Sequence, residues 1–338
     1  MTLVACIGGG QLGRMLALAG IPLGLRFRFL DPERDAPAAE LGELVVGAYD
    51  DPEALARLVD GADVVTYEFE NVPVDAALSA GALPPPLALE LGQDRLTEKQ
   101  LFRRLGIPTA SFGSLAETGL PALAKARRLG YDGKGQRRID VAGPLAAGEV
   151  AEELVDFDRE LSLVAVRGRD GDTRYWSLAE NVHRGGILRV SRAPAVGAPQ
   201  AEAEALAARL LDELGYVGVI ALELFEVGER LLANEFAPRV HNTGHWTIDG
   251  AETSQFENHL RAILGLPLGS TAPRGSSVMV NLVGGVPPVA ELLAVPGAHV
   301  CLYGKEPRPG RKVGHVTLVG ATDEAVAEAI RLSELYAA

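Results

Sequence analysis

The stretch LELFEVGERLLANEFAPRVHNTGHW, residues 222–246, decides the fold. Two apolar runs in and just before it flank a turn around Gly228, which predicts an antiparallel hairpin. Each run carries one carboxylate, Glu223 and Glu235, and the hairpin places the two side chains opposite each other or on a neighbouring diagonal. Like charges so placed repel, so a shared divalent cation is expected. Hard oxygens in small number favour Mg²⁺ that also binds substrate phosphates.

Polar and ionisable residues gather at the end of this hairpin, namely Asn234, Arg239, His241, Asn242 and His245. The alternative is a solvated hairpin edge followed by a polar loop. Exposed hairpins rarely gather these side chains around a carboxylate pair, so the stretch predicts a binding or catalytic site.

Composition narrows the class of protein. With 338 residues the chain exceeds one hydrophobic core, and two or three domains are expected. The formal charge of -13 argues against a nucleic-acid surface or an anionic membrane surface. The two cysteines, Cys6 and Cys301, lie in apolar runs, which favours free thiols in a reducing, cytoplasmic setting. No signal peptide and no uncharged run long enough to cross a bilayer is expected.

The N-terminal segment has the pattern of a nucleotide-binding turn. Residues 3–7 predict a buried strand, and GGGQLG at residues 8–13, which includes Gln11 and Leu12, leads into a helix over residues 14–19. A second strand, residues 26–30, ends at Asp31, near the position of a ribose-binding acid. Taken alone, this favours a nicotinamide-dependent dehydrogenase, although the glycine motif is weak by itself.

Further strands at residues 44–46 and 64–67, with a helix between them, predict a parallel sheet. The loop EFENV follows the last strand, and ligands of such sheets collect at the carboxyl ends of strands. Glu68 and Asn71 are therefore candidates for substrate contact, with capping of the helix after Pro73 as the alternative.

The middle of the chain contains a charged amphipathic helix over residues 94–105, whose Arg95 is by default a surface charge. The glycine-rich segment GYDGKGQ, residues 130–136, can fold over phosphates through its amides and Lys134, or form an ordinary hairpin turn. His183 is placed in a glycine-flanked turn, where a lone histidine is more often structural than catalytic.

An acidic segment precedes a strand within residues 149–166, and its carboxylates could bind Mg²⁺ or hydrogen-bond a base amine and a ribose. Sequence spacing does not separate these roles for Glu152, Glu153, Asp156, Asp158 and Glu160.

The C-terminal part predicts strands at residues 278–283, 299–303 and 315–319 and a closing helix at residues 323–336, a small α+β domain. One of its loops concentrates basic residues in an otherwise acidic protein, which indicates a bound phosphate or, alternatively, a solvated loop. These residues are Lys305, Arg308, Arg311 and Lys312.

Seven blocks, in order, resemble the N5-carboxyaminoimidazole ribonucleotide synthetase family of ATP-grasp enzymes. They are GGGQLGRM, QDRLTEK, GYDGKGQ, FDRELSLVAVRG, AENVHRGGIL, NEFAPRVHNTGHWT and YGKEPRPGRKVGH. The resemblance spans nearly the whole chain. The NEFAPRVHNTGHWT block together with GRKVGH is specific to the family, whereas the glycine motifs are not.

The resemblance implies an ATP-grasp fold of the α/β and α+β class, with a Rossmann-like parallel α/β domain at residues 1–88. An ATP-grasp domain would span residues 89–265, including a compact lid at about 107–165, and a small α+β domain would span residues 266–338. It also implies a homodimer of purine biosynthesis that uses ATP, Mg²⁺ and bicarbonate to carboxylate 5-aminoimidazole ribonucleotide (AIR).

Site roles follow from the same resemblance, position by position. ATP contacts would come from Arg95, Lys125, Gly130, Tyr131, Asp132, Gly133, Lys134, Gly135, Gln136 and His183. Adenine would meet Glu152, Glu153, Leu154 and Val155, the ribose Glu160, and the phosphate end Asn234 and Glu235. The metal ligands would be Glu223 and Glu235. AIR would be bound by Gln11, Leu12, Glu68, Asn71, Tyr131, Lys134, Lys305, Arg311 and Lys312.

Chemistry adds two roles near the metal pair. Arg239 is expected to stabilise the bicarbonate or carboxyphosphate anion, and His241 to handle a proton; Lys134 joins them as a catalytic candidate. The chain departs from the family in a shortened segment between Arg95 and Gly130, in the alanine-rich surroundings of Lys125 and in Thr243, where serine is common.

Three other functions compete with this interpretation. Another ATP-grasp ligase, such as a formate-using glycinamide ribonucleotide transformylase or a biotin-directed carboxylase, would share the nucleotide and metal residues but not the HNTGHW and GRKVGH blocks together. A nicotinamide-dependent oxidoreductase leaves the glutamate pair without a role. A non-catalytic regulatory relative is disfavoured because Glu223, Glu235, Lys125 and Arg239 are all retained.

Overall fold

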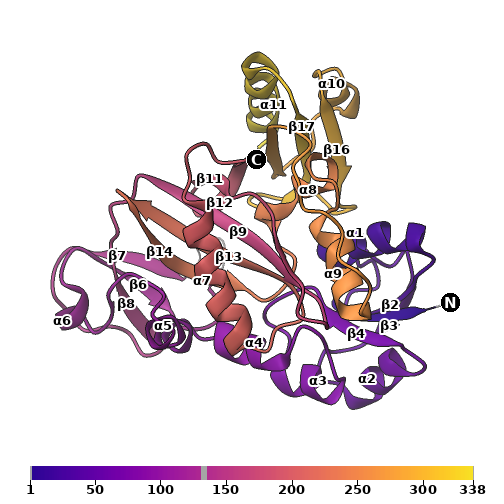
Figure 1. Cartoon of the computed structure of the whole chain (residues 1–338), viewed down its shortest axis with the longest axis horizontal. Helices are drawn as coiled ribbons and strands as arrows, with labels where there is room; N and C mark the ends of the chain where they lie inside the picture. The colour runs from indigo at the N-terminus through magenta and orange to yellow at the C-terminus, as the bar shows by residue number, and fades with distance from the viewer. Residues whose placement is uncertain (1, 131–134, 338) are drawn as a thin grey trace.

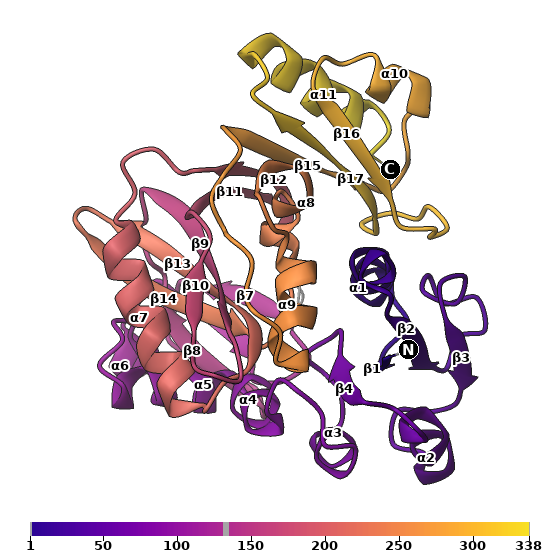
Figure 2. The same cartoon turned by 45° about the vertical axis from the view of Figure 1, so that its right-hand side comes forward.

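The computed structural model describes residues 2–130 and 135–337. Its described strands form three sheets, and the segments that carry them are arranged around a central, strongly twisted antiparallel sheet (Figure 1). In the second view, the N-terminal sheet and the C-terminal helices lie on the same side of the molecule, with α1 facing the C-terminal part (Figure 2).

The N-terminal unit is a parallel four-stranded sheet, as predicted, and its strand order is β3-β2-β1-β4. Its strands are β1 (Leu3–Ile7), β2 (Arg26–Asp31), β3 (Glu43–Val46) and β4 (Val64–Tyr67), and its helices are α1 (Gln11–Gly20), η1 (Ile21–Leu23), α2 (Pro52–Val59) and α3 (Val74–Ser79). Helix α1 begins three residues earlier than expected. The glycine loop therefore turns directly into the helix, and its amides point to the carboxyl ends of β1 and β4.

Two helices lead from this unit to a small lid sheet. They are α4 (Pro86–Gly92) and α5 (Arg95–Arg104), and the lid contains β5 (Phe112–Gly113), α6 (Leu115–Thr118), β6 (Ala122–Ala126), β7 (Gln136–Ile139) and β8 (Glu149–Glu153), in the strand order β5-β8-β6-β7. Although alanine is a weak strand former, β6 holds Lys125 in a regular strand because β7 and β8 pair with it on both sides.

The central sheet has nine described strands in the order β14-β13-β9-β11-β12-β15-β17-β16, with β10 paired to β9. Its strands before residue 240 are β9 (Arg159–Arg167), β10 (Thr173–Tyr175), β11 (Ala179–Arg184), β12 (Ile187–Ala193), β13 (Gly218–Val227) and β14 (Arg230–Ala237). Consecutive residues of β9 pack on opposite faces: Leu163 joins the core under α7 (Gln200–Glu213), and Val164 joins the core under α9 (Gln255–Leu264). Both faces of the strands behind the site are thus buried.

The C-terminal strands extend this same sheet. After η2 (Asn242–Gly244) and α8 (Thr247–Gly250) come β15 (Ser277–Val283), α10 (Val289–Leu293), β16 (Ala298–Leu302), β17 (Lys312–Val319) and α11 (Asp323–Leu335). Strand β15 pairs with β12, for example at Val190 and Val280. The expected strands and closing helix are present, and the strands continue the central sheet. The pairing covers an otherwise open edge of β12.

No helix within the described part of the chain has the length and apolarity needed to cross a bilayer.

Candidate active site

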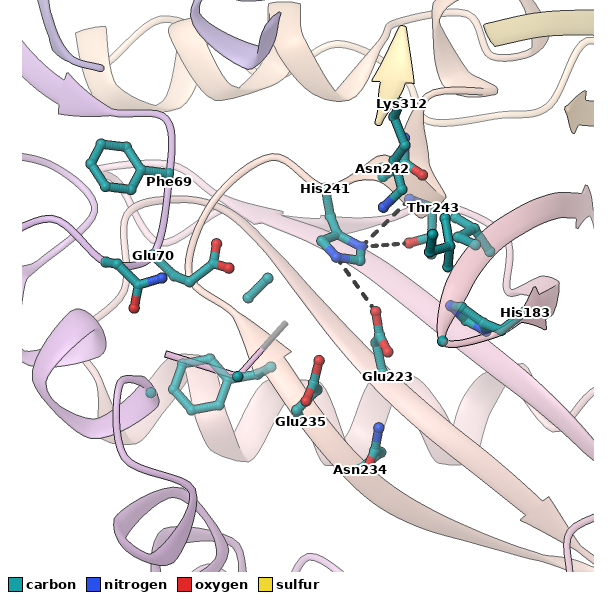
Figure 3. A pocket seen from close by; sticks show the side chains of 18 of the residues that line it. Phe69, Glu70, His183, Glu223, Asn234, Glu235, His241, Asn242, Thr243 and Lys312 are labelled. Atoms are coloured by element: carbon teal, nitrogen blue, oxygen red, sulfur yellow. Dashed lines mark hydrogen bonds and ion pairs between the residues drawn. The ribbon is translucent and has the colours of Figure 1, made fainter. Parts of the chain in front are cut away.

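The hairpin β13–β14 places its two glutamates side by side. Glu223 pairs with Glu235 in the antiparallel register, as predicted. The next pair is Leu224 with Ala233, so Asn234 is an extra residue in a β-bulge. Its Oδ1 atom is buried and has no hydrogen-bond partner among the described residues. Figure 3 shows Glu223, Glu235 and Asn234 on the same pair of strands below His241.

The two carboxylates differ in electrostatic surroundings. Burial and the neighbouring Glu235 charge raise the pKa of Glu223 to about 7. Burial would raise the pKa of Glu235 as well, but the Arg95 guanidinium, with Nη1 2.8 Å from Oε2, gives a net lowering. Glu235 is therefore ionised at neutral pH, whereas Glu223 is only partly ionised until a cation lies beside it. Arg95 is no surface charge, since it is paired with the predicted metal ligand.

A rigid loop covers the pair. The Nε2 atom of His241 lies 3.4 Å from Oε1 of Glu223, and its Nδ1 atom lies 2.9 Å from Oγ1 of Thr243 (Figure 3). Gln255 fixes the loop backbone by accepting from the His241 amide at 2.9 Å and donating to its carbonyl at 2.6 Å. Burial and then the nearby Arg239 charge hold the pKa of His241 well below 6.5, so the imidazole is neutral.

Arg239 faces the same cavity and is held by a partner that the sequence did not reveal. Its guanidinium forms an ion pair with Glu70, and it donates to the Val240 carbonyl at 2.9 Å. Glu70 belongs to the EFENV loop after β4, where only Glu68 and Asn71 were predicted. The available signal was that Glu70 is the second carboxylate in that loop.

One cavity of about 980 Å³ joins these groups to the rest of the predicted site. The predicted residues that line it are Gln11, Leu12, Glu68, Asn71, Arg95, Lys125, Gly130, Gly135, Gln136, Glu160, His183, Glu223, Asn234, Glu235, Arg239, His241, Lys305, Arg311 and Lys312. The predicted contacts Tyr131, Asp132, Gly133 and Lys134 lie outside the described residues. The cavity thus brings together side chains from α1 and the loop after β4 with side chains from the other two sheets.

The predicted adenine segment does not line this cavity. Glu152 is buried at 2 % exposure, and its Oε2 atom accepts from the Lys125 ammonium at 2.8 Å and lies 3.4 Å from the Lys99 ammonium. The adenine role of Glu152, Glu153, Leu154 and Val155 stays a prediction. Glu98 and Lys99 were not predicted; their signal was two charges on the α5 face that also carries Leu101 and Phe102, all four buried.

His183 lies in strand β11, not in the expected turn, which follows at Gly185. Its Nδ1 atom is 2.5 Å from Oε2 of Glu160. Burial lowers the pKa of His183, but the hydrogen bond and charge of Glu160 outweigh it and raise the pKa above 6.5. The two side chains predicted to contact the nucleotide therefore form a pair at the cavity wall.

At the other end of the cavity, the glycine loop is filled by the chain's own carboxylates. Glu68 accepts from the amides of Gly10 at 2.6 Å and Gly13 at 2.8 Å, and Asp31 accepts from Gly9 at 2.8 Å. A dinucleotide pyrophosphate needs these amides, so this loop does not offer the site that an oxidoreductase requires. Lys305 reaches in from the C-terminal part to Gln11, and burial lowers its pKa to about 8.

Comparison with known proteins agrees with this geometry. The chain matches the family models for the ribonucleotide synthetase preATP-grasp domain over residues 1–93, the ATP-grasp domain over residues 102–256 and the phosphoribosylaminoimidazole carboxylase C-terminal domain over residues 277–329. It is 51% identical to the N5-carboxyaminoimidazole ribonucleotide synthase of Pseudomonas aeruginosa, with 99% of this chain and 98% of the relative covered.

Solved structures give the same result. The N5-carboxyaminoimidazole ribonucleotide synthetase of Thermus thermophilus is 54% identical with a TM-score of 0.93, covering 99% of this chain and 98% of that one. The Aspergillus clavatus enzyme, solved with ADP and 5-aminoimidazole ribonucleotide, is 29% identical with a TM-score of 0.90, and 99% of each chain is covered. The oxidoreductase interpretation is overturned, and the chain belongs to the N5-carboxyaminoimidazole ribonucleotide synthase family of ATP-grasp ligases.

Proposed function

We propose that this chain uses ATP and bicarbonate to carboxylate the 5-amino group of AIR, giving N5-carboxyaminoimidazole ribonucleotide, ADP and phosphate. The observation that carries the proposal is the shared cavity. It joins the Glu223–Glu235 pair with Arg95 and Lys125 to the basic loop that contains Arg311. A triphosphate and a ribonucleotide phosphate thus have separate cationic partners within one cavity.

The reaction follows from the chemistry of bicarbonate, which is a poor electrophile. A bicarbonate oxygen attacks the γ-phosphorus of ATP, the bond to ADP breaks, and carboxyphosphate forms. The amine of AIR then attacks the carboxyl carbon, or the CO₂ released from it; phosphate leaves, and the amine loses a proton. Carboxyphosphate is hydrolysed by water, so the site must stay closed between the two steps.

The chain's own residues supply the anion stabilisation. Arg239 faces the cavity, and Glu70 holds its guanidinium in place, so it can stabilise the bicarbonate or carboxyphosphate anion without reorganising. His241 is neutral, and its Nδ1 atom accepts from the Thr243 amide, so the ring proton is on Nε2 beside Glu223. We assign His241 the handling of a proton. Lys134 is a third catalytic candidate.

The glutamate pair fits Mg²⁺. Two facing carboxylates and the unpartnered Oδ1 of Asn234 provide hard oxygen ligands. The described residues contain no cluster of three or more His, Cys, Asp or Glu suited to a metal, so nucleotide phosphates would complete the coordination. When bound there, Mg²⁺ would neutralise charge on the transferring phosphoryl group.

Nucleotide and AIR contacts are assigned to the lining residues. Arg95, Lys125 and the 130–136 loop would hold the phosphates, and the Glu160–His183 pair the nucleoside. Glu68 and Asn71, with Gln11 and Leu12, would contact AIR, and Lys305, Arg311 and Lys312 would hold its phosphate.

Two properties of the whole protein complete the proposal. We expect a cytoplasmic enzyme. Both cysteines are free thiols, with Cys6 buried and Cys301 partly buried, which is in keeping with a reducing compartment. We also expect a homodimer; Leu18, Ile21 and Leu23 of the N-terminal unit are exposed apolar side chains that a second copy could cover. Light scattering of the purified chain tests the oligomeric state.

A coupled assay of ADP formation tests the function. ADP production with Mg²⁺ should require ATP, bicarbonate and AIR together, with one N5-carboxylated product formed for each ADP. Replacing bicarbonate and AIR by formate and glycinamide ribonucleotide tests the rival ATP-grasp activity. Equal ADP production with and without AIR, or activity with the formate pair, would contradict the proposal.

A further inference from the structure

Lysine is used sparingly in this chain, and the lysines that the structure describes lie at or beside the cavity. The sequence contains five lysines. Lys125, Lys305 and Lys312 line the cavity. Lys99 on α5 does not line it and is completely buried, at 0 % exposure. Burying an ammonium group is costly unless it is paired and hydrogen-bonded. The burial of the Lys99 ammonium group therefore requires a physical explanation.

The surroundings of Lys99 are built for a charged ammonium. Its Nζ atom lies 3.0 Å from Oγ1 of Thr109, 3.3 Å from the Ala233 carbonyl and 3.4 Å from Oε2 of Glu152. The Thr109 hydroxyl gives its own proton to the Ala233 carbonyl at 2.7 Å, so its oxygen accepts from Lys99. Three acceptors match the three N–H groups of an ammonium. Burial lowers the pKa of Lys99, and Glu152 opposes that shift.

Two lysine ammonium groups lie beside the same carboxylate oxygen of Glu152. Its Oε2 atom accepts from Lys125 at 2.8 Å as well as facing Lys99. Its Oε1 atom is buried and has no hydrogen-bond partner in the described ranges. Burial would raise the pKa of Glu152, but the charges of Lys99 and then Lys125 lower it to about 2. The carboxylate is thus ionised, and only one of these two counter-ions lines the cavity.

We infer that Lys99 is a positioning residue: it remains paired with Glu152 while the Lys125 ammonium transfers its contact from Glu152 to a nucleotide phosphate. The inference rests on the proposed role of Lys125 in binding ATP. If Lys125 were the only partner of Glu152, its transfer would leave a buried carboxylate without a counter-ion, and such a charge is strongly destabilising. With Lys99 in place, Glu152 stays paired throughout.

The arrangement of elements agrees with this role. Glu152 and Lys125 belong to neighbouring strands β8 and β6 of the lid, whereas Lys99 belongs to α5 and also binds the backbone of β14. Lys99 is therefore fixed to the body of the protein, beside the strand that carries Glu235. Of the two lysines in contact with Glu152, Lys125 is the one on the cavity wall.

A double-mutant cycle separates this role from a purely structural one. The variants are Lys99→Met, Glu152→Gln and the pair, in the full chain, and the measurement is the Kd of Mg·ADP by calorimetry at fixed ionic strength. Without Lys99, Glu152 retains Lys125, and we expect nucleotide binding to weaken about tenfold or more. In the Lys99→Met background, Glu152→Gln releases Lys125, so this substitution should tighten nucleotide binding about tenfold. In the background that retains Lys99, Glu152→Gln should tighten nucleotide binding about twofold or less.

Equal effects of Glu152→Gln in the two backgrounds would overturn the inference, because a general loss of charge or of packing predicts additivity. Arg331→Met is the matched control: it removes a cation paired with Glu328 on the exposed face of α11, and Kd should stay within about twofold. Thermal unfolding of each variant reports folding.

If Lys99→Met does not fold, Glu152→Gln alone decides. Binding that is unchanged or up to about twofold tighter supports the inference. Weaker binding means that Glu152 itself contacts the nucleotide, and a much larger tightening means that Lys99 does not keep Glu152 paired; either result overturns the inference. Failure of the proposed function is distinguishable, because the unmodified chain would then lack AIR-dependent ADP formation whatever the binding cycle shows.

Discussion

The two ends of the cavity treat negative charge in opposite ways. At the glycine loop, backbone amides of Gly10 and Gly13 are satisfied by the carboxylate of Glu68, so the chain fills its own anion site. At the hairpin, Glu223 and Glu235 face each other, and Glu235 is the member of the pair that binds a guanidinium of the chain, Arg95. The first end is closed electrostatically, and the second is left open for a divalent cation.

The difference shows why a glycine loop predicts a bound ligand less well than a carboxylate pair does. A glycine loop before a helix creates a demand for negative charge, and a nearby carboxylate can meet it as well as a phosphate can. A carboxylate pair creates a demand for positive charge: burial and the Glu235 charge raise the pKa of Glu223 to about 7, although His183 and Lys312 oppose that shift. This end of the cavity is therefore the one expected to bind the metal.

The largest expected effect is at the open end. Glu235→Gln removes the ionised member of the pair, and we expect the rate of AIR-dependent ADP production to fall at least about 100-fold, because Mg²⁺ no longer has a charged ligand beside Arg95. Circular dichroism and thermal unfolding should show a retained fold. A variant with a near-normal rate would remove the distinction between the two ends.

The basic loop is expected to act on one substrate only. Arg311→Ala removes a cation that lines the cavity, and the KM for AIR should rise about 10- to 100-fold, as expected for loss of a charge-assisted contact to phosphate. The KM for ATP should change little, which initial-rate kinetics with each substrate varied in turn will show. Equal changes in both constants would count against a separate phosphate site.

A substitution at the glycine loop should change the stability of the protein. Glu68→Ala leaves the Gly10 and Gly13 amides without their carboxylate, and we expect the free energy of unfolding in urea to fall by about 2 kcal/mol. Inorganic phosphate should then stabilise the variant more than the parent, since the vacated loop becomes an anion site. An unchanged unfolding free energy would show that the loop does not depend on Glu68.

The smallest effect concerns the Glu160–His183 pair. Because Glu160 raises the pKa of His183 above its unfolded value near 6.5, the pair contributes stability that is complete at lower pH and is lost as pH rises through the folded-state pKa. Relative to His183→Gln, the parent should lose less than about 1 kcal/mol of unfolding free energy on going from pH 6 to pH 9. Urea titrations across this range measure it, and a gain of relative stability with rising pH would have the wrong sign.

The site could be predicted where local rules determine geometry. Strand periodicity and a glycine turn fix the hairpin register, so the pairing of Glu223 with Glu235 was predicted correctly. Most of the strands that were predicted lie within one or two residues of their observed bounds for the same reason. The parallel sheet of the N-terminal unit was predicted from alternating strand and helix patterns.

The remainder depends on contacts between distant segments. The bulge at Asn234 is a single extra residue that neither periodicity nor the turn determines. The pairing of β15 with β12 joins the C-terminal strands to the central sheet, and sequence pattern does not specify which edge a strand will meet. The partners of Arg239 and Glu152 are likewise set by tertiary packing, so their side chains were assigned to ligands without knowledge of Glu70 and Lys99.

Binding of Mn²⁺ in place of Mg²⁺ tests the open end most directly, because its paramagnetic signal reports the bound ion without turnover. In the presence of ADP, the parent chain should bind Mn²⁺, and both Glu223→Gln and Glu235→Gln should weaken that binding at least about tenfold. If both variants bind Mn²⁺ and ADP as tightly as the parent, the facing glutamates are not the metal site, and the account of this cavity is contradicted.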